Sequence, residues 1–297
     1  MARDWEGVFT TWAKGPGATE QERAENAEAQ VRRAIQSSAK LAERDIKIFV
    51  QGSYRNRVNV RQDSDVDVGV LCFDTYYAEY GDDNIKALVE KTEVAGTFPY
   101  AQFKNEVEEA LVARFGRAAV TRGKKAFDIK ANSYRVSADV VPVFEHRRWV
   151  SASNYLSGVQ LYPDVGPTII NWPEQHYTNG TSKNDATKHS YKRMVRILKN
   201  LRNEMAEQGA AAAKPIPSFL IECLVWNVPN EYFGHSKWNP IVKDCLAFLF
   251  NHTMDDTAPR EWGEVSELKY LFRPSQPWTR SQAHAFIDAA WDYIGYE

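Results

Sequence analysis

Short apolar runs alternate with amphipathic stretches along the first half of the chain. Residues 46–50 form a β-branched run that ends in Gln-Gly-Ser, and residues 66–73 form a second apolar run that begins with alternating polar positions. Both patterns predict strands, and the first strand leads into a tight turn. The other elements expected in this half are helices at residues 19–42, 83–92 and 99–115 and strands near residues 126–130 and 135–144.

The pattern becomes helical in the second half. Helices are expected at residues 185–208, 218–228 and 239–251, and a last one begins near residue 279. The sequence therefore predicts an α/β (α+β) fold with an N-terminal α/β lobe, residues 1–160, and a helical C-terminal lobe, residues 161–297. The N-terminal helix is expected to brace both lobes.

Composition and charge narrow the classes of function. The chain of 297 residues has 43% hydrophobic residues, 26% charged residues and a net charge of −2, so it lacks the positive excess that captures polymeric DNA or RNA. Its three cysteines lie far apart, which excludes a disulfide framework and favours the cytoplasm. A secretion signal and a membrane-spanning run are not expected.

Two aspartates begin the second predicted strand. Asp65 and Asp67 are two residues apart and project to the same face of a strand, where two carboxylates repel one another unless a cation lies between them. Asp139 is a third acid, within the apolar strand Val-Ser-Ala-Asp-Val-Val-Pro-Val-Phe, where a lone charge is costly to bury. Three carboxylates on neighbouring strands predict a two-metal site with Mg²⁺, or Mn²⁺, as the ion.

A glycine-serine turn precedes the aspartates. Gly52 allows a close backbone approach to phosphate, and the Ser53 hydroxyl can bond to it. An isolated Asp-x-Asp is also typical of a solvated strand end, and an isolated Gly-Ser turn is weaker still. The combination of strand, Gly-Ser, eleven residues, Asp-x-Asp and a later strand acid is far more specific.

This set resembles the signature of the polymerase-β-like nucleotidyltransferase superfamily. Within it, the chain resembles the bacterial CD-NTases (cGAS/DncV-like nucleotidyltransferases), and specifically their clade E, CdnE. The resemblance is carried by the segments FVQGSYRNRVNVRQDSDVDVGV, SADVVPVF, INWPEQHYTNG, RILKNLRNEM and PSFLIECLVWNVP, which span residues 46–229. It implies a catalytic lobe with a mixed sheet, a helical nucleotide-binding lobe and an active site in the cleft between them.

The resemblance also implies roles for individual residues. Asp65, Asp67 and Asp139 would bind two metal ions, with Asp139 helping to deprotonate the acceptor hydroxyl, and Gly52 and Ser53 would hold the donor phosphates. Lys199 and Ser218 match positions that grip the triphosphate. From the residues themselves, Lys199 also fits a solvated face of a basic amphipathic helix, and Ser218 also fits a helix N-cap after a proline.

One further position concerns the choice of base. Asn171 matches the position at which clade E members that use pyrimidines carry an asparagine facing the base, and an amide suits the donor and acceptors of uracil. An Asn before a proline-containing loop is equally typical of a turn. The first interpretation predicts a product that contains UMP: cyclic di-UMP or cyclic UMP–AMP.

The implied activity is a cyclic dinucleotide synthase of CBASS anti-phage defence, with UTP and ATP as substrates and a downstream effector protein that responds to the product. The zinc-bearing DNA-binding insertion of cGAS has no counterpart, because the chain has no Cys/His cluster, so stable DNA binding is not expected; nor is membrane binding, and the protein is expected to be a monomer. The alternatives are a nucleotidyltransferase acting on an RNA 3′ end, a small molecule or a protein, and a non-catalytic nucleotide-binding module.

Overall fold

A computed structural model describes residues 3–60, 65–91, 93, 96–133 and 137–297. The chain divides into two compact units. The sheet unit comprises Gly17–Arg55 and Arg61–Pro173, and the helical unit comprises Met1–Pro16, Asn56–Val60 and Glu174–Glu297. Each unit has its own hydrophobic core.

The sheet unit is built on a mixed sheet. In the described residues its strands are β1 (Ile46–Val50), β2 (Val66–Tyr80), β3 (Val120–Arg122), β4 (Phe127–Ile129), β5 (Ala138–Ser151), β6 (Asn154–Leu161) and β7 (Ile169–Asn171). The strand order is β1-β2-β5-β4-β3, and β6 pairs with both β5 and β7. The β2–β5 pair is parallel and the other pairs are antiparallel, which confirms the mixed sheet that the sequence predicts.

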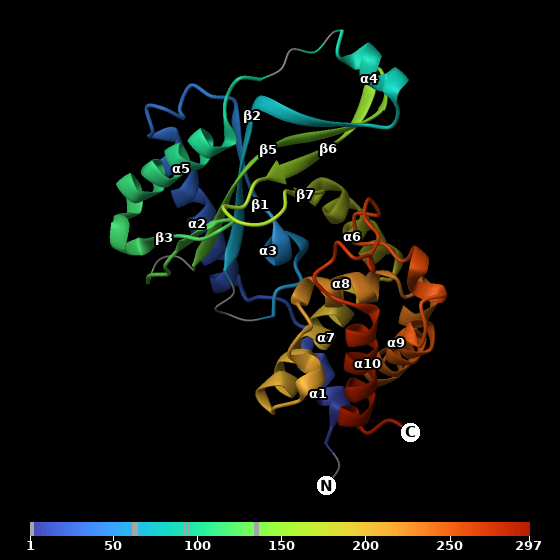
Figure 1. Ribbon diagram of the computed structural model, residues 1–297. Coiled ribbons are helices and arrows are strands. Elements are labelled where there is room, and N and C mark those ends of the chain that lie inside the picture. Colours follow the sequence, from blue (N-terminus) through green and yellow to red (C-terminus); the bar gives the residue numbers. More distant parts are fainter. Residues whose placement is uncertain (1–2, 61–64, 92, 94–95, 134–136) are drawn as a thin grey trace. The chain divides into compact units, whose positions relative to one another are not determined.

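Helices α2 and α5 cover one face of this sheet (Figure 1). Their apolar side chains, such as Val31 and Val107, pack with strand residues such as Val66 and Val140 in the core. The helices of the unit are α2 (Ala18–Gln36), α3 (Gly52–Asn56), α4 (Asp83–Val89), α5 (Tyr100–Phe115) and the 3₁₀ turn η1 (Arg117–Ala119). The opposite face of the central strands is not covered by α2 and α5 and carries both polar and apolar side chains, such as Asp139 and Val141.

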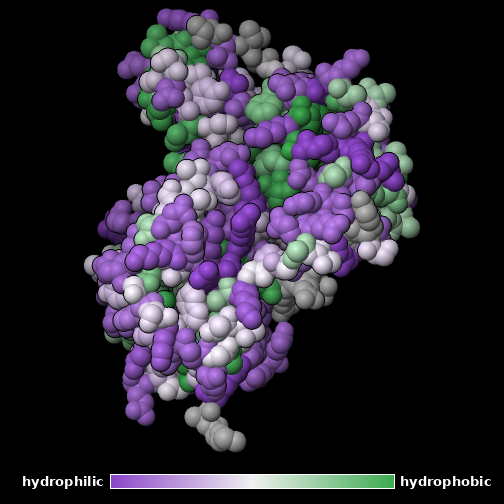
Figure 2. All heavy atoms as spheres, turned by 180° about the vertical axis from the view of Figure 1, so that it is seen from behind, coloured by the Kyte–Doolittle hydropathy of each residue, from purple (hydrophilic) through white to green (hydrophobic). Residues whose placement is uncertain are grey.

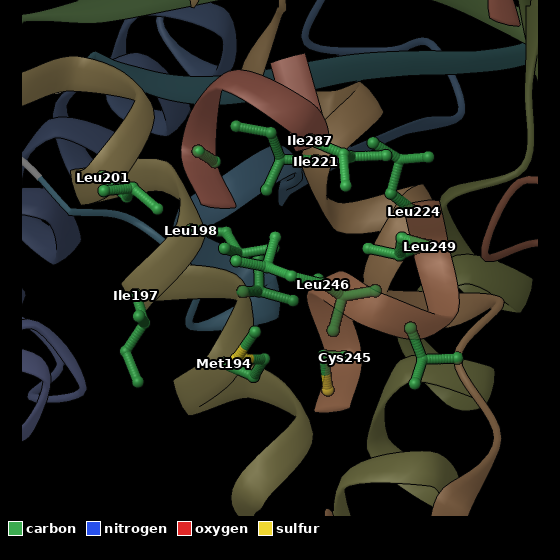
Figure 3. Close-up of a cluster of buried hydrophobic side chains, with 14 of the residues drawn as sticks. Met194, Ile197, Leu198, Leu201, Ile221, Leu224, Cys245, Leu246, Leu249 and Ile287 are labelled. Carbon is green, nitrogen blue, oxygen red and sulfur yellow. The ribbon is translucent and has the colours of Figure 1, made fainter. Parts of the chain in front are cut away.

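The helical unit is held together by a cluster to which several helices contribute. Figure 3 shows Leu198, Ile221, Leu246 and Ile287 in this cluster, one each from α7, α8, α9 and α10. The helices are α1 (Trp5–Trp12), α6 (Pro173–Ala186), α7 (Ser190–Glu207), η2 (Ala211–Ala213), α8 (Ser218–Trp226), η3 (Asn230–Phe233), α9 (Trp238–Thr253), η4 (Ala258–Glu261) and α10 (Arg280–Ile294). Polar side chains dominate the face shown in Figure 2.

Several predicted elements differ from those observed. The helix expected at residues 185–208 corresponds to α7, which begins later, at Ser190. Lys188 and His189 before it are both left-handed, with φ of 48° and 68°, and L-residues cannot continue a right-handed helix in that conformation. Helix α6 (Pro173–Ala186) was not expected. Helix α2, expected at residues 19–42, begins after Gly17 without a side-chain cap and ends earlier, at Gln36. Strands β6 and β7 carry no alternation strong enough to have been predicted.

The boundary between the units also lies later than residue 160. Strand β7 pairs with β6 and belongs to the sheet unit, which extends to Pro173. Helix α1 packs in the helical unit, where Phe9 is fully buried, whereas α2 packs against the sheet. In the part of the chain that the structure describes, no helix has the length and apolar character that crossing a membrane requires.

Candidate active site

Three central strands each carry an aspartate between two buried apolar residues. The triplets are Val66-Asp67-Val68 in β2, Ala138-Asp139-Val140 in β5 and Phe127-Asp128-Ile129 in β4. The sheet register pairs Asp67 with Asp139 and Asp139 with Asp128. Successive strand residues point to opposite faces, so the three aspartates form one row across the sheet face that α2 and α5 leave uncovered.

Asp65 lies directly before β2 and two residues from Asp67. It is exposed, whereas Asp67 and Asp139 are half-buried. The backbone N–H of Val66 donates to the Ser137 carbonyl at 2.9 Å, which fastens the start of β2 to the start of β5. The structure thus places Asp67 and Asp139 side by side on neighbouring strands, with Asp65 two residues before Asp67.

Gly52 lies against the carboxylate of Asp67. The Gln51 N–H donates to the Asp67 carbonyl at 2.9 Å, and Gly52 follows with φ of +64°. A Cβ atom on Gly52 would lie 2.1 Å from Asp67 Oδ2, so neither the backbone conformation nor the space suits another residue. The Gly-Ser turn is the first turn of the short helix α3, with Ser53 half-buried beside it.

Burial and mutual repulsion shift the titration of these acids. Burial raises the pKa of Asp67 to about 7, and the neighbouring Asp139 and Asp65 add to the shift. Burial likewise raises the pKa of Asp139, with Asp65 and Asp128 contributing. Burial and Asp128 raise the pKa of Asp65, while a side-chain hydrogen bond with Ser137 opposes the rise. The carboxylates of the site therefore repel one another when they are ionised.

Asp128 is a residue that the sequence interpretation missed. It is exposed, lies opposite Asp139 in the register and contributes to the raised pKa of both Asp65 and Asp139. The signal that would have found it is the repeated pattern of an aspartate between two apolar residues. A search for Asp-x-Asp pairs does not find Asp128, because β4 contains a single acid.

The donor set has the chemistry of a hard divalent cation site. Oxygen ligands suit such ions, and a cation relieves the repulsion between carboxylates. In the described part of the chain, no three or more His, Cys, Asp or Glu side chains lie close enough to surround one ion. The aspartates share a row without converging on one point, so the fit to a cation rests on their chemistry and charge.

The raised pKa of Asp67 predicts a pH-dependent stability in metal-free protein. With a pKa of about 7 in the folded state and about 4 in the unfolded chain, Asp67 favours folding while it stays protonated. That contribution is complete below pH 4 and is lost as the pH rises to about 7; over three pKa units it is on the order of 4 kcal/mol. We expect Asp67→Asn, which cannot ionise, to melt several degrees above wild type at pH 8 in EDTA.

Thermal unfolding at pH 5 and pH 8, with EDTA or excess Mg²⁺, measures this effect. The exposed Asp288 on α10 provides the control variant Asp288→Asn. The difference between wild type and Asp67→Asn should shrink at pH 5 and in Mg²⁺. A difference that is the same at both pH values would contradict the titration of Asp67.

Lys199 is enclosed within the helical unit. The side chain is 3% exposed, and its Nζ lies 3.6 Å from Glu222 Oε2 and donates to the Val58 carbonyl at 3.3 Å. His176 Nε2 lies 2.8 Å from the other oxygen of Glu222. Although burial opposes its ionisation, His176 and Lys199 lower the pKa of Glu222 to about 2. Lys199 therefore does not lie on a solvated helix face.

Ser218 is the first residue of α8, and Pro217 occupies the N-cap position. The Ser218 hydroxyl accepts a hydrogen bond from Arg202 Nη2 at 2.8 Å. The interpretation of Ser218 as an N-cap is therefore wrong, because its hydroxyl bonds to a side chain of α7 rather than to the first turn of α8.

Asn171 ends β7 with its side chain exposed. Its neighbour Trp172 is buried against Gly158, where a Cβ atom would lie 2.7 Å from the indole ring and 2.8 Å from the Asn171 carbonyl. Arg148 and His146 flank the same indole, at 4.6 Å and 5.4 Å from its ring centre. The backbone of Asn171 therefore lies closely against β6, and the residue itself is exposed.

Comparisons with known proteins give a consistent result. A family model for the cGAS/DncV-like nucleotidyltransferase C-terminal helical domain matches residues 178–295. The chain is 44% identical to the cyclic dipyrimidine nucleotide synthase CdnE of Legionella pneumophila, over 99% of both chains. Its structure resembles the CdnE c-UMP-AMP synthase of Rhodothermus marinus with Apcpp and Upnpp, with a TM-score of 0.85, 28% identity and 98% coverage of both chains.

The structure of a third similar protein was solved with different nucleotides. The Elizabethkingia meningoseptica CdnE cyclic dinucleotide synthase, solved with GTP and Apcpp, has a TM-score of 0.83 and 34% identity, and the match covers 99% of this chain and 100% of that one. Proteins similar to this chain therefore include ones with different bases, so the choice of base must be argued from individual residues.

Proposed function

Because the chain belongs to the CD-NTase family of cGAS/DncV-like nucleotidyltransferases, in its CdnE clade, we propose that it is a cyclic dinucleotide synthase. The pairing of Asp67 with Asp139 in the sheet register, with Asp65 two residues before Asp67 and Gly52 against the Asp67 carboxylate, is the observation that carries this proposal. The 3′-hydroxyl of one nucleotide attacks the α-phosphate of a second, the bond to pyrophosphate breaks, and a second transfer closes the ring.

The sheet unit supplies the residues for this chemistry. Asp65, Asp67 and Asp139 would hold two Mg²⁺ or Mn²⁺ ions, which activate the attacking hydroxyl and stabilise the leaving pyrophosphate. Gly52 and Ser53 bind the donor phosphates through backbone N–H groups and a hydroxyl. Asp139 would accept the proton of the attacking hydroxyl.

Lys199 and Ser218 complete the proposal as triphosphate-binding residues of the helical unit. Ser218 is half-buried at the first turn of α8, with Arg202 bonded to its hydroxyl, so a cationic group already lies at this point. Lys199 would reach a phosphate by leaving Glu222, which keeps His176 as a partner.

The proposed reaction is tested by measuring whether pyrophosphate release requires an added acceptor molecule. Purified protein with NTPs and Mg²⁺ should release pyrophosphate without any added macromolecule and should yield a product that resists phosphatase, because a cyclic product has no terminal phosphate. Pyrophosphate release that begins only when RNA, a small molecule or a protein is added would replace cyclisation with transfer to that acceptor.

We propose a uracil-containing product, cyclic di-UMP or cyclic UMP–AMP, made from UTP or from UTP and ATP. The dipyrimidine synthase of Legionella pneumophila and the c-UMP-AMP synthase of Rhodothermus marinus support it, as does the exposed amide of Asn171. Uracil presents an N–H donor between two carbonyl acceptors, so one amide can bond to both kinds of group.

Replacing Asn171 tests the choice of base. We expect Asn171→Ser to shift incorporation from UTP towards purines, because the shorter side chain loses the paired contact. An unpaired buried polar group costs about 1–3 kcal/mol, or roughly five- to a hundredfold in selectivity. Competition among the four NTPs, read by product mass, measures the shift, while total turnover should stay substantial.

Asn154→Ser is a matched control, since Asn154 is an exposed asparagine on the neighbouring strand β6. It should leave the choice of base unchanged. Wild-type protein that makes purine products alone would show that Asn171 is misassigned, and unchanged preferences in Asn171→Ser would assign base recognition to another residue.

The biological setting follows from the same proposal. The enzyme would act in the cytoplasm as a monomer, without stable DNA binding, in CBASS anti-phage defence, and an effector protein would respond to its product. Cys72, Cys223 and Cys245 are free and buried, which suits a reducing compartment.

A further inference from the structure

The segment Asn56–Val60 begins at the last residue of α3 and belongs to the helical unit. Val58 is fully buried in the core of that unit, together with Phe9 and Leu198. Four residues earlier, Tyr54 is buried in the core of the sheet unit. The chain therefore passes from one core to the other immediately after Gly52 and Ser53, and the end of α3 is anchored on both sides.

Arg196 of α7 binds this segment through its backbone. Its Nη1 donates to the Arg57 carbonyl at 2.5 Å, and its Nε and Nη2 donate to the Ala13 carbonyl at 2.9 and 2.5 Å. The residue is 8% exposed. Hydrogen bonds from a charged group are stronger than neutral ones, so a buried guanidinium joins α7 to two separate stretches of backbone.

The conformation of Arg57 indicates that this contact holds the backbone in place. Arg57 is left-handed, with φ of 55°, which is disfavoured for a residue with a side chain. Lys199, one turn further along α7, donates to the carbonyl of the next residue, Val58. Two cations of one helix thus bind consecutive carbonyls at a point where the backbone conformation is unfavourable by itself.

We infer that Arg196 is a positioning residue for the phosphate-binding turn at Gly52 and Ser53: by binding the Arg57 carbonyl, it fixes the end of α3 and so the backbone that meets the donor phosphates. The inference rests on the proposed function, because it assigns the turn to phosphate binding. Arg196 itself does not touch the nucleotide in this account.

Steady-state kinetics test the inference, because KM and kcat are expected to respond differently to the loss of Arg196. Arg196→Met should raise KM for NTP about tenfold, the effect of losing roughly one charge-assisted hydrogen bond. It should change kcat less than about threefold, because the turn holds the phosphates alike before and during reaction. Arg193→Met is the control, since Arg193 is an exposed arginine on the same helix, and it should alter neither value.

Hydrogen exchange without nucleotide tests the contact independently of catalysis. Amides of residues 52–58 should exchange faster in Arg196→Met than in wild type or Arg193→Met, while amides of β2 and α8 should not change. If wild-type protein makes no cyclic product, the proposed function fails, and the exchange result still decides whether Arg196 holds the segment.

A rescue experiment separates positioning from a general loss of stability. Glycine adopts the left-handed conformation without penalty, so Arg57→Gly in the Arg196→Met background should lower KM again by roughly fivefold. Arg57→Ala removes the same side chain and should give no rescue. Faster exchange throughout the helical unit, or a KM that neither rises in Arg196→Met nor responds to Arg57→Gly, would overturn the inference.

Discussion

The double variant Asp65→Asn, Asp67→Asn is expected to lose NTP turnover by several orders of magnitude and to keep its fold. Asparagine preserves the size of each side chain and removes the charge that binds metal, and loss of a catalytic metal site removes the activation of the attacking hydroxyl. The fold should survive, because the change relieves the repulsion that contributes to the raised pKa of Asp67. Pyrophosphate release and circular dichroism measure the two effects.

The matched control removes two other negative charges. Asp288 and Asp292 are exposed on α10, so Asp288→Asn, Asp292→Asn should retain wild-type turnover. Product formation at the wild-type rate by the Asp65, Asp67 variant, with contaminating enzyme excluded, would remove these residues from the catalytic site.

Gly52→Ala is expected to reduce turnover at least a hundredfold. The added Cβ would lie 2.1 Å from Asp67 Oδ2, a separation that forces the carboxylate or the turn to move. Displacing a catalytic group by about 1 Å is enough to cost roughly a hundredfold in rate. The φ of +64° at this position adds a backbone penalty of about 1 kcal/mol. Turnover and thermal unfolding should therefore both fall.

Gly116→Ala separates the two causes. Gly116 also has a positive φ, of +82°, but nothing lies within 4 Å of the position of its Cβ. It should show the backbone penalty in stability and keep its turnover. Equal turnover in the two variants would show that the close approach of Gly52 to Asp67 has no role in the reaction.

Elements with strong local patterns were predictable from the sequence. The strand expected at residues 46–50 is β1 (Ile46–Val50) with the same bounds, and the helix expected at residues 99–115 is α5 (Tyr100–Phe115). The break at Lys188 and His189 was not predictable, since neither residue is a glycine or a proline. The pairing of β6 and β7 depends on contacts distant in sequence, which local periodicity does not contain.

The candidate site was predictable to the extent that it depends on strand alternation. Asp67 and Asp139 were expected on neighbouring strands and are direct partners in the register. Asp128 was missed because its strand is short and contains one acid. The enclosure of Lys199 depends on Glu222, which lies on a different helix, so the amphipathic pattern of α7 does not reveal the ion pair.

Mass spectrometry of the products from an equimolar mixture of the four NTPs with Mg²⁺ shows directly whether the protein is a cyclic dinucleotide synthase. We expect the wild-type protein to form one dominant cyclic dinucleotide that contains UMP, and the Asp65→Asn, Asp67→Asn variant to form none. Recovery of unchanged NTPs from the wild-type protein, or of linear products alone, would contradict the assignment as a cyclic dinucleotide synthase.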